Sequence, residues 1–448
     1  MTRTVHSRFE LRAAELHPSV DDPALHSMTF LNEVSHRYPD AISLAAGRPV
    51  ESFFELDSVH RYLDVFCQHL RDDLGYSEEE VRRTIFQYGR TKGVLHHLIA
   101  RNLAVDENID ADPESVVVTV GCQEALYLCL RALRSDDQDV VLAVSPTYVG
   151  LAGAARLADM RVLPVREAGG IDFDDLFSVL RHARGRGLRP RALYVIPDFA
   201  NPSGVNMTVE DKRRLLDVAA QQDFLVLEDN PYGLFSDTDE RPPTLKALDT
   251  RNQVVYLGTL AKSALPGVRI GYAVADQEVV TAHGTRTLFA DELAKIKSMV
   301  TVNTSPIAQA IAGGRLLEHG CSLVRANARE TEHYRVNRRH LLNGLADRFR
   351  RGDPDAAGVS WNSPTGGFFV VVTVPFAADD ALLERSARVH GVLWTPMHHF
   401  YLGDGGLNQL RLSCAALPPE QVDLGLDRLH ALVTESLTAS RKGAKHQC

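Results

Sequence analysis

The chain has 448 residues, of which 44% are hydrophobic and 24% are charged. At roughly 150 residues per domain, this length predicts two or three domains, and the composition is that of an ordinary globular protein. The formal net charge of −9 disfavours nucleic acid or an anionic membrane as a main partner, because both attract basic surfaces.

The sequence shows no sign of export or membrane insertion. No apolar segment approaches the ~20 residues of a membrane-spanning helix, and the charged segment 1–18 lacks the apolar core of a signal peptide. The cysteines form no CxxC pair and no disulfide-framework spacing, which is typical of a reducing compartment; they are Cys67, Cys122, Cys129, Cys321, Cys414 and Cys448. We therefore expect a cytoplasmic protein.

In chain order, the first element is an arm over 1–45 with a helix near its start. Short apolar strands then alternate with amphipathic helices from about 112 to 275. We expect strands at 115–121, 140–146, 161–167, 192–199, 224–230, 254–260 and 269–275, and helices at 122–134, 149–158, 172–184 and 208–222. Such an alternation predicts an α/β fold, with a mostly parallel sheet covered by helices on both faces.

After residue 305 the pattern changes to long helices over 306–350 and then to alternating strands such as 366–375. This change predicts a smaller α+β unit that includes part of the N-terminal segment. The expected division is an arm and part of the small domain over 1–65, a large domain over 66–320, a small domain over 321–440 and a frayed tail over 441–448.

Polar groups follow several of the predicted strands directly. In open α/β sheets, ligands bind at the carboxyl ends of the strands, so five such groups together indicate a ligand site. The groups that follow strands are Gly121 with Cys122 and Gln123, Asn201, Asp229 with Tyr232, and Thr259 with Lys262, and the fifth group is Arg269, which opens the next strand. Pro266 and Gly267 form a turn that can bring Lys262 and Arg269 to one place.

The segment YLGTLAKSALPGVRIGY around Lys262 resembles the lysine motif of the class I/II aminotransferases, which are fold-type I enzymes dependent on pyridoxal 5′-phosphate (PLP). The resemblance implies a large domain with a mostly parallel mixed sheet and a smaller α+β domain. It also implies that Lys262 carries PLP as a Schiff base and moves the Cα proton, with a pKa lowered by nearby cations. Thr259 and Arg269 would hold the phosphate, the arginine by charge-assisted hydrogen bonds.

Other motifs match the same family. Asp229, in LEDNPYG, resembles the carboxylate that pairs with the pyridine nitrogen and keeps the ring able to accept electrons. Asn201, in NPSG, and Tyr232 would hydrogen-bond the ring oxygen. Tyr148, in SPTYVG, aligns with the aromatic residue that stacks on the ring, although a tyrosine of the core is the alternative.

Three further features concern the phosphate, a partner subunit and the substrate. The backbone N–H groups of Gly121, Cys122 and Gln123 open a helix and so suit the phosphate. Tyr88, in FQYGRTKG, resembles the tyrosine that reaches the neighbouring subunit's phosphate, which implies a homodimer with shared sites. Arg411, in NQLRLSC, resembles the arginine that binds the substrate α-carboxylate through its planar fork. Asn201 and Arg48 would also face the substrate.

The motifs QYGRTKG, TVGCQEAL and LEDNPYG are similar to the aminoadipate and kynurenine aminotransferase branch. PDFANPSG and RPPTLKALDT resemble PLP enzymes of actinomycete antibiotic pathways, of the dihydroxyphenylglycine aminotransferase or lincosamide type. The predicted function is amino transfer between an amino acid, aromatic or non-proteinogenic, and an α-keto acid in specialised metabolism. The alternative on the same fold is a C–S lyase or a decarboxylating oxidative deaminase.

Several positions depart from the family pattern and bear on substrate and reaction rather than on the cofactor. Ala261 replaces a common serine, Arg48 replaces an apolar residue, and His398 with His399 replaces a common Pro-Gly pair. Two adjacent histidines can bind a metal, but the sequence shows no carboxylate or cysteine beside them. No metal site is therefore expected.

Overall fold

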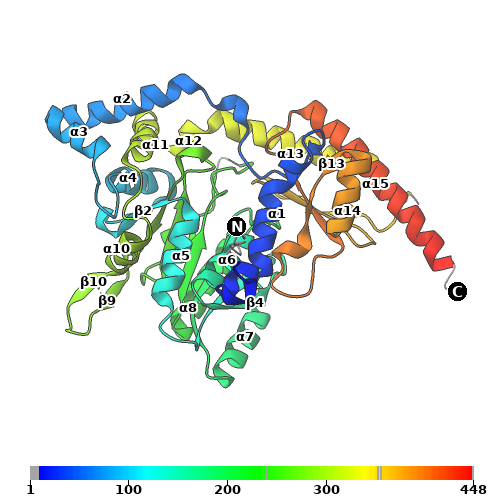
Figure 1. Ribbon diagram of the computed structural model, residues 1–448, viewed down its shortest axis with the longest axis horizontal. Helices are drawn as coiled ribbons and strands as arrows, with labels where there is room; N and C mark the ends of the chain where they lie inside the picture. Colours follow the sequence, from blue (N-terminus) through cyan, green and yellow to red (C-terminus); the bar gives the residue numbers. More distant parts are fainter. Residues whose placement is uncertain (1–9, 239, 351–352, 354–355, 446–448) are drawn as a thin grey trace, which may run out of the picture.

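The structure is a computed structural model that describes residues 10–238, 240–350, 353 and 356–445. A seven-stranded sheet in the order β2-β8-β7-β6-β5-β3-β4 forms the centre of its larger part (Figure 1). The strands are β2 (Val116–Val120), β3 (Asp139–Ser145), β4 (Arg161–Arg166), β5 (Arg189–Val195), β6 (Leu225–Asp229), β7 (Val254–Thr259) and β8 (Ile270–Val274). β8 runs antiparallel to β2 and β7, and the pairs from β7 to β4 are parallel. The prediction of a mostly parallel mixed sheet is confirmed.

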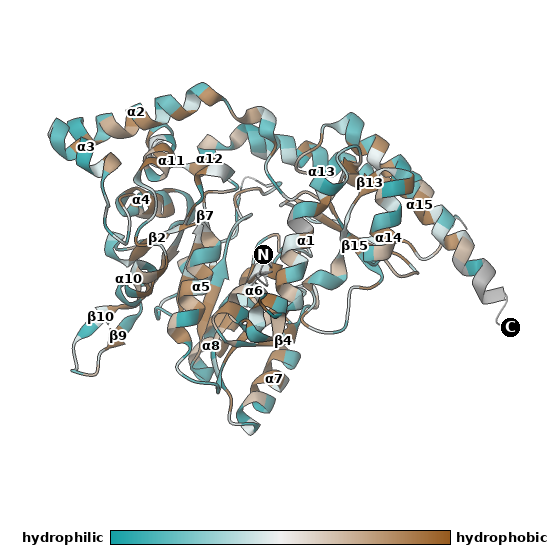
Figure 2. Cartoon of the chain, in the orientation of Figure 1, coloured by the Kyte–Doolittle hydropathy of each residue, from teal (hydrophilic) through white to brown (hydrophobic). Residues whose placement is uncertain are grey.

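Helices cover both faces of this sheet because its strands are apolar on both sides. On β3, Val141 and Ala143 pack on one face and Leu142 and Val144 on the other, as the two-residue period of a strand requires. The first face is covered by α5 (Cys122–Leu133), α6 (Val149–Leu157) and α10 (Phe289–Val300), and the second by α7 (Phe173–Gly185) and α8 (Val209–Gln222). Figure 2 shows apolar residues gathered on the central strands.

A third apolar cluster lies at the β2–β8 end of the sheet. There Val116 and Val118 pack with α2 (Leu56–Asp72), α3 (Glu78–Phe86), α4 (His96–Glu107) and α11 (Pro306–Glu318). Because α2 begins at Leu56, the predicted domain boundary at residue 66 falls within a helix. A short hairpin, β9 (Glu278–Val280) and β10 (Arg286–Leu288), extends from the same end, and the short helix α9 (Leu245–Leu248) precedes β7.

The smaller part is built around an antiparallel sheet in the order β11-β12-β15-β14. Its strands are β11 (Ser360–Trp361), β12 (Phe369–Thr373), β15 (Gln409–Ser413) and β14 (Thr395–Pro396), and its helices are α12 (Leu323–Ala326), α13 (Ala328–Arg348), α14 (Asp380–Arg385) and α15 (Pro419–Lys445). The N-terminal strand β1 (Ile42–Ser43) pairs with β13 (Val392–Leu393), and Val34 and Leu44 belong to the same core as Trp394. The arm therefore contributes to the smaller part.

Two terminal elements differ from the sequence prediction. The arm's α-helix is α1 (Pro23–Arg37), in the middle of the arm rather than near its start, because Asp22 caps Ala24 N (3.0 Å) and Pro23 occupies the first turn. At the other end, α15 continues to Lys445, four residues beyond Arg441, so most of the predicted frayed tail is helical. Residues 1–9 and 446–448 lie outside the described part.

Among the described residues, no helix combines the length and apolar character needed to cross a bilayer. The five described cysteines are free thiols.

Candidate active site

A cavity of about 390 Å³ lies where the carboxyl ends of the central strands face the smaller part. It collects most of the site residues that the sequence predicted, together with residues of the arm. The predicted residues that line it are Arg48, Cys122, Gln123, Tyr148, Asn201, Asp229, Tyr232, Thr259, Lys262, Arg269 and Arg411.

Lys262 follows β7 and lies half-buried in this cavity. Its Nζ donates a hydrogen bond to the Gly47 carbonyl at 2.7 Å. Burial, together with the cations Arg411 and Arg269, lowers the pKa of Lys262 to about 8, and Asp229 opposes this shift. The neutral fraction of the amine near physiological pH is therefore far larger than for an ordinary lysine, which suits a nucleophile or a base.

Asp229, at the end of β6, is buried and held by two neighbours. Its Oδ2 accepts a hydrogen bond from the Tyr194 hydroxyl at 2.6 Å, and its Oδ1 accepts one from Cys122 Sγ at 3.6 Å. Burial raises the pKa of Asp229 to about 6, although the two donors and Lys262 lower it. A carboxylate fixed in this way at a cavity wall suits a cationic ring nitrogen.

One end of the cavity is built for an anion. Gly121 has a φ of 77° and precedes α5, whose first N–H groups have no partner within the helix. A Cβ on Gly121 would lie 2.3 Å from Arg269 Nη2, so only glycine lets the guanidinium approach the helix start. The Thr259 hydroxyl accepts from Ala261 N at 3.1 Å and keeps its own proton to donate. These donors match the three oxygens of a phosphate.

The opposite end holds Arg411 on β15, which is buried. Its Nη1 donates to Asn201 Oδ1 at 2.5 Å and its Nη2 to Thr395 Oγ1 at 3.3 Å. Its Cζ lies 4.0 Å and 4.7 Å from the ring centroids of Phe369 and Phe400. Within the described part of the chain, no carboxylate pairs with it, and its Nε is buried without a partner.

Burial lowers the pKa of Arg411 to about 10, which still leaves it charged at neutral pH. A buried guanidinium without an acidic partner is costly. The arrangement is therefore suited to a carboxylate brought in by a ligand.

Two tyrosines stand between these ends. Tyr232 is buried and hydrogen-bonds to the Asn201 side chain. Burial raises the pKa of Tyr232 and of Tyr148, so both stay protonated and can donate. Tyr148 lines the cavity and also packs against the core.

Two of the predicted site residues, Tyr88 and Arg48, are exposed at the surface of the single chain. Tyr88 is 85% exposed and does not line the cavity in the single chain. Arg48 lies exposed at the cavity, where Ser35 and His36 of α1 also contribute. Sequence reasoning missed both α1 residues, and it missed Tyr194, since the approach of Tyr194 to Asp229 depends on the pairing of β5 with β6.

The expectation that no carboxylate lies beside His398 and His399 is wrong. The structure places a carboxylate, Asp380 of α14, 2.8 Å from His399 Nε2. Asp380 lies 18 residues before His398 in the chain, a separation that spacing motifs do not reveal.

A lysine amine, a buried carboxylate and an anion-binding helix start around one cavity fit PLP by their chemistry, since it carries an aldehyde, a basic ring nitrogen and a phosphate. The family profile for aminotransferase class I and II matches residues 62–429. The chain belongs to this family and is a PLP-dependent transaminase.

The chain is similar along nearly its whole length to one characterised transaminase and to solved aminotransferase structures. The chain is 54% identical over 429 residues, 96% of each chain, to (S)-3,5-dihydroxyphenylglycine transaminase of Amycolatopsis orientalis. Kynurenine aminotransferase of Pyrococcus horikoshii, solved with PMP, covers 96% of this chain and 98% of its own at 26% identity and a TM-score of 0.78. LysN, the α-aminoadipate aminotransferase of Thermus thermophilus, solved with N-(5′-phosphopyridoxyl)-L-leucine, covers 94% and 98% at 27% identity and a TM-score of 0.74.

The lowered pKa of Lys262 predicts a pH dependence of cofactor capture by the apoenzyme. Because only the neutral amine attacks an aldehyde, the rate of covalent PLP uptake is expected to rise with pH to a midpoint near the lysine pKa of about 8. An ordinary lysine would place this midpoint at about 10.4. Stopped-flow absorbance measures the rate, and Arg411→Met, which removes one lowering cation, is expected to move the midpoint upward. A midpoint near that of an ordinary lysine would contradict the prediction.

Proposed function

We propose that the enzyme transfers the amino group between an (S)-arylglycine with a hydroxylated ring, of the 3,5-dihydroxyphenylglycine type, and an α-keto acid in specialised metabolism. The observation that carries the chemistry is the buried Arg411, which pairs with no carboxylate among the described residues and lies in the same cavity as Lys262. The substrate class is supported by the 54% identity to the Amycolatopsis orientalis transaminase along 96% of both chains.

The cofactor supplies a carbonyl that attaches the substrate amine and a ring that accepts the electron pair left at Cα. Residues Gly121 to Gln123, with Thr259 and Arg269, would hold its phosphate. Asp229 would pair with its ring nitrogen, Asn201 and Tyr232 would donate to its ring oxygen, and Tyr148 would pack against the ring.

Arg411 binds the substrate carboxylate through its fork and thereby orients the substrate. With the carboxylate held in this way, the Cα–H bond is the one presented for cleavage. Lys262 Nζ lies in the same cavity and would serve as the base for the Cα proton, which its lowered pKa allows.

The polar mouth of the cavity suits a hydroxylated ring. Ser35, His36 and Arg48 contribute there, and each can hydrogen-bond a phenol hydroxyl.

The substrate proposal is tested by comparing amino donors on the holoenzyme with one fixed keto acid. The kcat/KM for (S)-3,5-dihydroxyphenylglycine is expected to exceed that for (S)-phenylglycine by roughly 10-fold or more, because a site built for hydroxyl groups leaves its polar groups unpaired without them. Arg48→Leu is expected to reduce this preference. Equal or higher kcat/KM for phenylglycine or α-aminoadipate would overturn the proposed substrate class.

Arg411→Lys keeps the positive charge and removes the planar fork. We expect a higher KM and a lower kcat together, with kcat/KM reduced by about 100-fold, which is roughly 2.7 kcal/mol of transition-state stabilisation. Steady-state kinetics measures both parameters, and Arg286→Lys on the exposed β9–β10 hairpin is the matched control. An unchanged kcat with Arg411→Lys would mean that the guanidinium does not orient the reacting bond.

We also propose a homodimer with shared active sites. Phe86 (72%), two residues before Tyr88, and Met299 (84%), four residues before Asn303, are large apolar side chains that are exposed, as is typical of residues at an interface. The segment around Gly89 lies next to the segment around Asn303, because an added Cβ on Gly89 would lie 3.8 Å from Asn303 Nδ2. Tyr88 would then reach the phosphate of the partner's site. Cytoplasmic localisation stays a prediction from the sequence.

A subunit-mixing experiment tests the sharing. Tyr88→Ala and Lys262→Ala homodimers are each expected to be weak or inactive. Hybrids of the two contain one site with both groups intact, so mixing is expected to restore activity that neither parent has. Hybrids that form, as native mass spectrometry can verify, without any gain in activity would show that Tyr88 does not act across the interface.

A further inference from the structure

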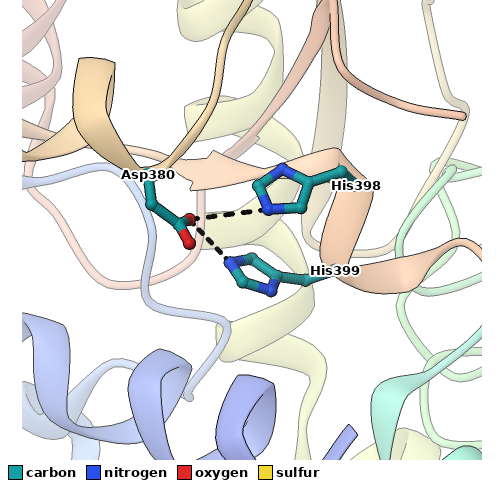
Figure 3. Close-up of side chains that lie close together, drawn as sticks. All are labelled: Asp380, His398 and His399. Atoms are coloured by element: carbon teal, nitrogen blue, oxygen red, sulfur yellow. Dashed lines mark hydrogen bonds and ion pairs between the residues drawn. The ribbon is translucent and has the colours of Figure 1, made fainter. Parts of the chain in front are cut away.

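Asp380, His398 and His399 converge at the surface of the smaller part, outside the cofactor cavity (Figure 3). His398 and His399 belong to the 3₁₀ turn Met397–Phe400, and Asp380 is the first residue of α14. One ligand atom from each of the three lies within 4.8 Å of the others. Within the described residues, no other group of three histidine, cysteine or acidic side chains meets this condition.

The distances between these atoms combine one hydrogen bond with one longer approach, and both are compatible with a shared ion. His399 Nε2 lies 2.8 Å and His398 Nε2 3.7 Å from the same oxygen, Asp380 Oδ1. The second distance is too long for a hydrogen bond. Two ligands that each stand about 2 Å from a zinc ion lie a little over 3 Å apart in tetrahedral geometry, which falls between the two observed distances.

Residues of α1 fix the orientation of the His399 ring. His399 Nδ1 is hydrogen-bonded to Ser27 Oγ of α1 at 2.8 Å, and its ring lies 5.3 Å from that of Phe30. This contact turns Nε2 toward Asp380, the arrangement in which outer-shell groups orient metal-binding histidines. His398 Nδ1 is buried, which leaves Nε2 as its available ligand atom.

Solvent can reach the cluster. The side-chain exposures of 51% for Asp380 and 26% for His398 leave room for solvent ligands.

We infer that Asp380, His398 and His399 bind one divalent transition-metal ion of the zinc class, with water completing its coordination. Two imidazole nitrogens and one carboxylate oxygen favour such an ion over Mg²⁺ or Ca²⁺, which require mostly oxygen ligands. The ion joins α14 to the turn Met397–Phe400, and through Ser27 it fixes α1, which lines the cavity mouth. Phe400, next to His399, stacks on Arg411, so the site lies one residue from the substrate-binding end.

The test is a zinc titration of the full-length holoenzyme against a chromophoric chelator. Wild type is expected to bind a single tight zinc ion per chain. Asp380→Asn and His399→Gln, which keep side-chain size, are expected to weaken this binding by more than about 100-fold, and Ser27→Ala by about 10-fold. The matched control is His340→Ala, because His340 pairs with Asp423 at 2.9 Å without a second histidine, and this variant is expected to bind zinc as wild type does.

X-ray absorption of the zinc-loaded enzyme supplies an independent readout. A first shell of nitrogen and oxygen without sulfur is expected, which separates this site from one made by free thiols. Equal zinc affinity in wild type, Asp380→Asn and His399→Gln would overturn the inference, as would a shell that contains sulfur.

Discussion

Lys262→Ala is expected to abolish turnover while leaving the fold intact. Removal of the amine removes both the attachment point of PLP and the base at Cα. General-base contributions alone are about 10²–10⁴-fold, so kcat is expected to fall by roughly four orders of magnitude or more. The variant still has the phosphate-binding groups and is expected to retain PLP without a covalent bond. Absorbance of the purified variant and steady-state assays with an excess of keto acid measure the two effects.

The position of the covalent bond is checked by borohydride reduction and peptide mapping. In wild type the reduced label is expected on the peptide that contains Lys262. Lys295, an exposed lysine on α10, is the matched control, because Lys295→Ala should change neither label nor rate. Label on any other lysine would contradict the assignment.

Asp229→Ala is expected to have the second largest effect. The carboxylate is buried, and loss of one partner of a buried ion pair costs about 3–5 kcal/mol. At 1.36 kcal/mol per factor of ten, this slows proton removal from Cα by roughly 10²–10⁴-fold. Single-turnover kinetics with α-deuterated substrate measures that step, and the isotope effect is expected to persist or grow.

Two milder variants around Asp229 serve as controls. Tyr194→Phe removes one hydrogen bond to the carboxylate, and Cys122→Ser preserves a donor at the same place. Each is expected to change the rate far less than Asp229→Ala, since a single hydrogen bond contributes about 1 kcal/mol. If Asp229→Ala stays within a factor of about ten of wild type, another group protonates the cofactor ring.

Much of the fold could be predicted from sequence because its signals are local. The strands of the larger part are short apolar runs, and the helices between them have an amphipathic period, so β2 to β8 and α5 to α8 fall within a few residues of the predicted ranges. The polar residues at strand ends follow from the same reading, since parallel strands end at one edge. That is why Asp229, Thr259 and Lys262 could be grouped before any geometry was known.

The remaining features depend on contacts that no local pattern encodes. Tyr194 reaches Asp229 through the register of β5 with β6, and its own strand shows only an aromatic residue in an apolar run. Ser35 and His36 enter the cavity because α1 packs between the larger and smaller parts (Figure 1). Asp380 meets His399 through the fold of the smaller part. Tertiary packing rather than periodicity decides each of these positions.

The most direct test of the transaminase proposal is a reaction without an amino acceptor. Holoenzyme is mixed with excess (S)-3,5-dihydroxyphenylglycine and no keto acid, and the keto acid, ammonia and CO₂ are quantified against the concentration of chains. A single equivalent of the corresponding keto acid per chain is expected, with no ammonia and no CO₂, and turnover should resume when an α-keto acid is added. Continued release of ammonia or CO₂ over many turnovers without an acceptor would contradict transamination and favour the decarboxylating deaminase.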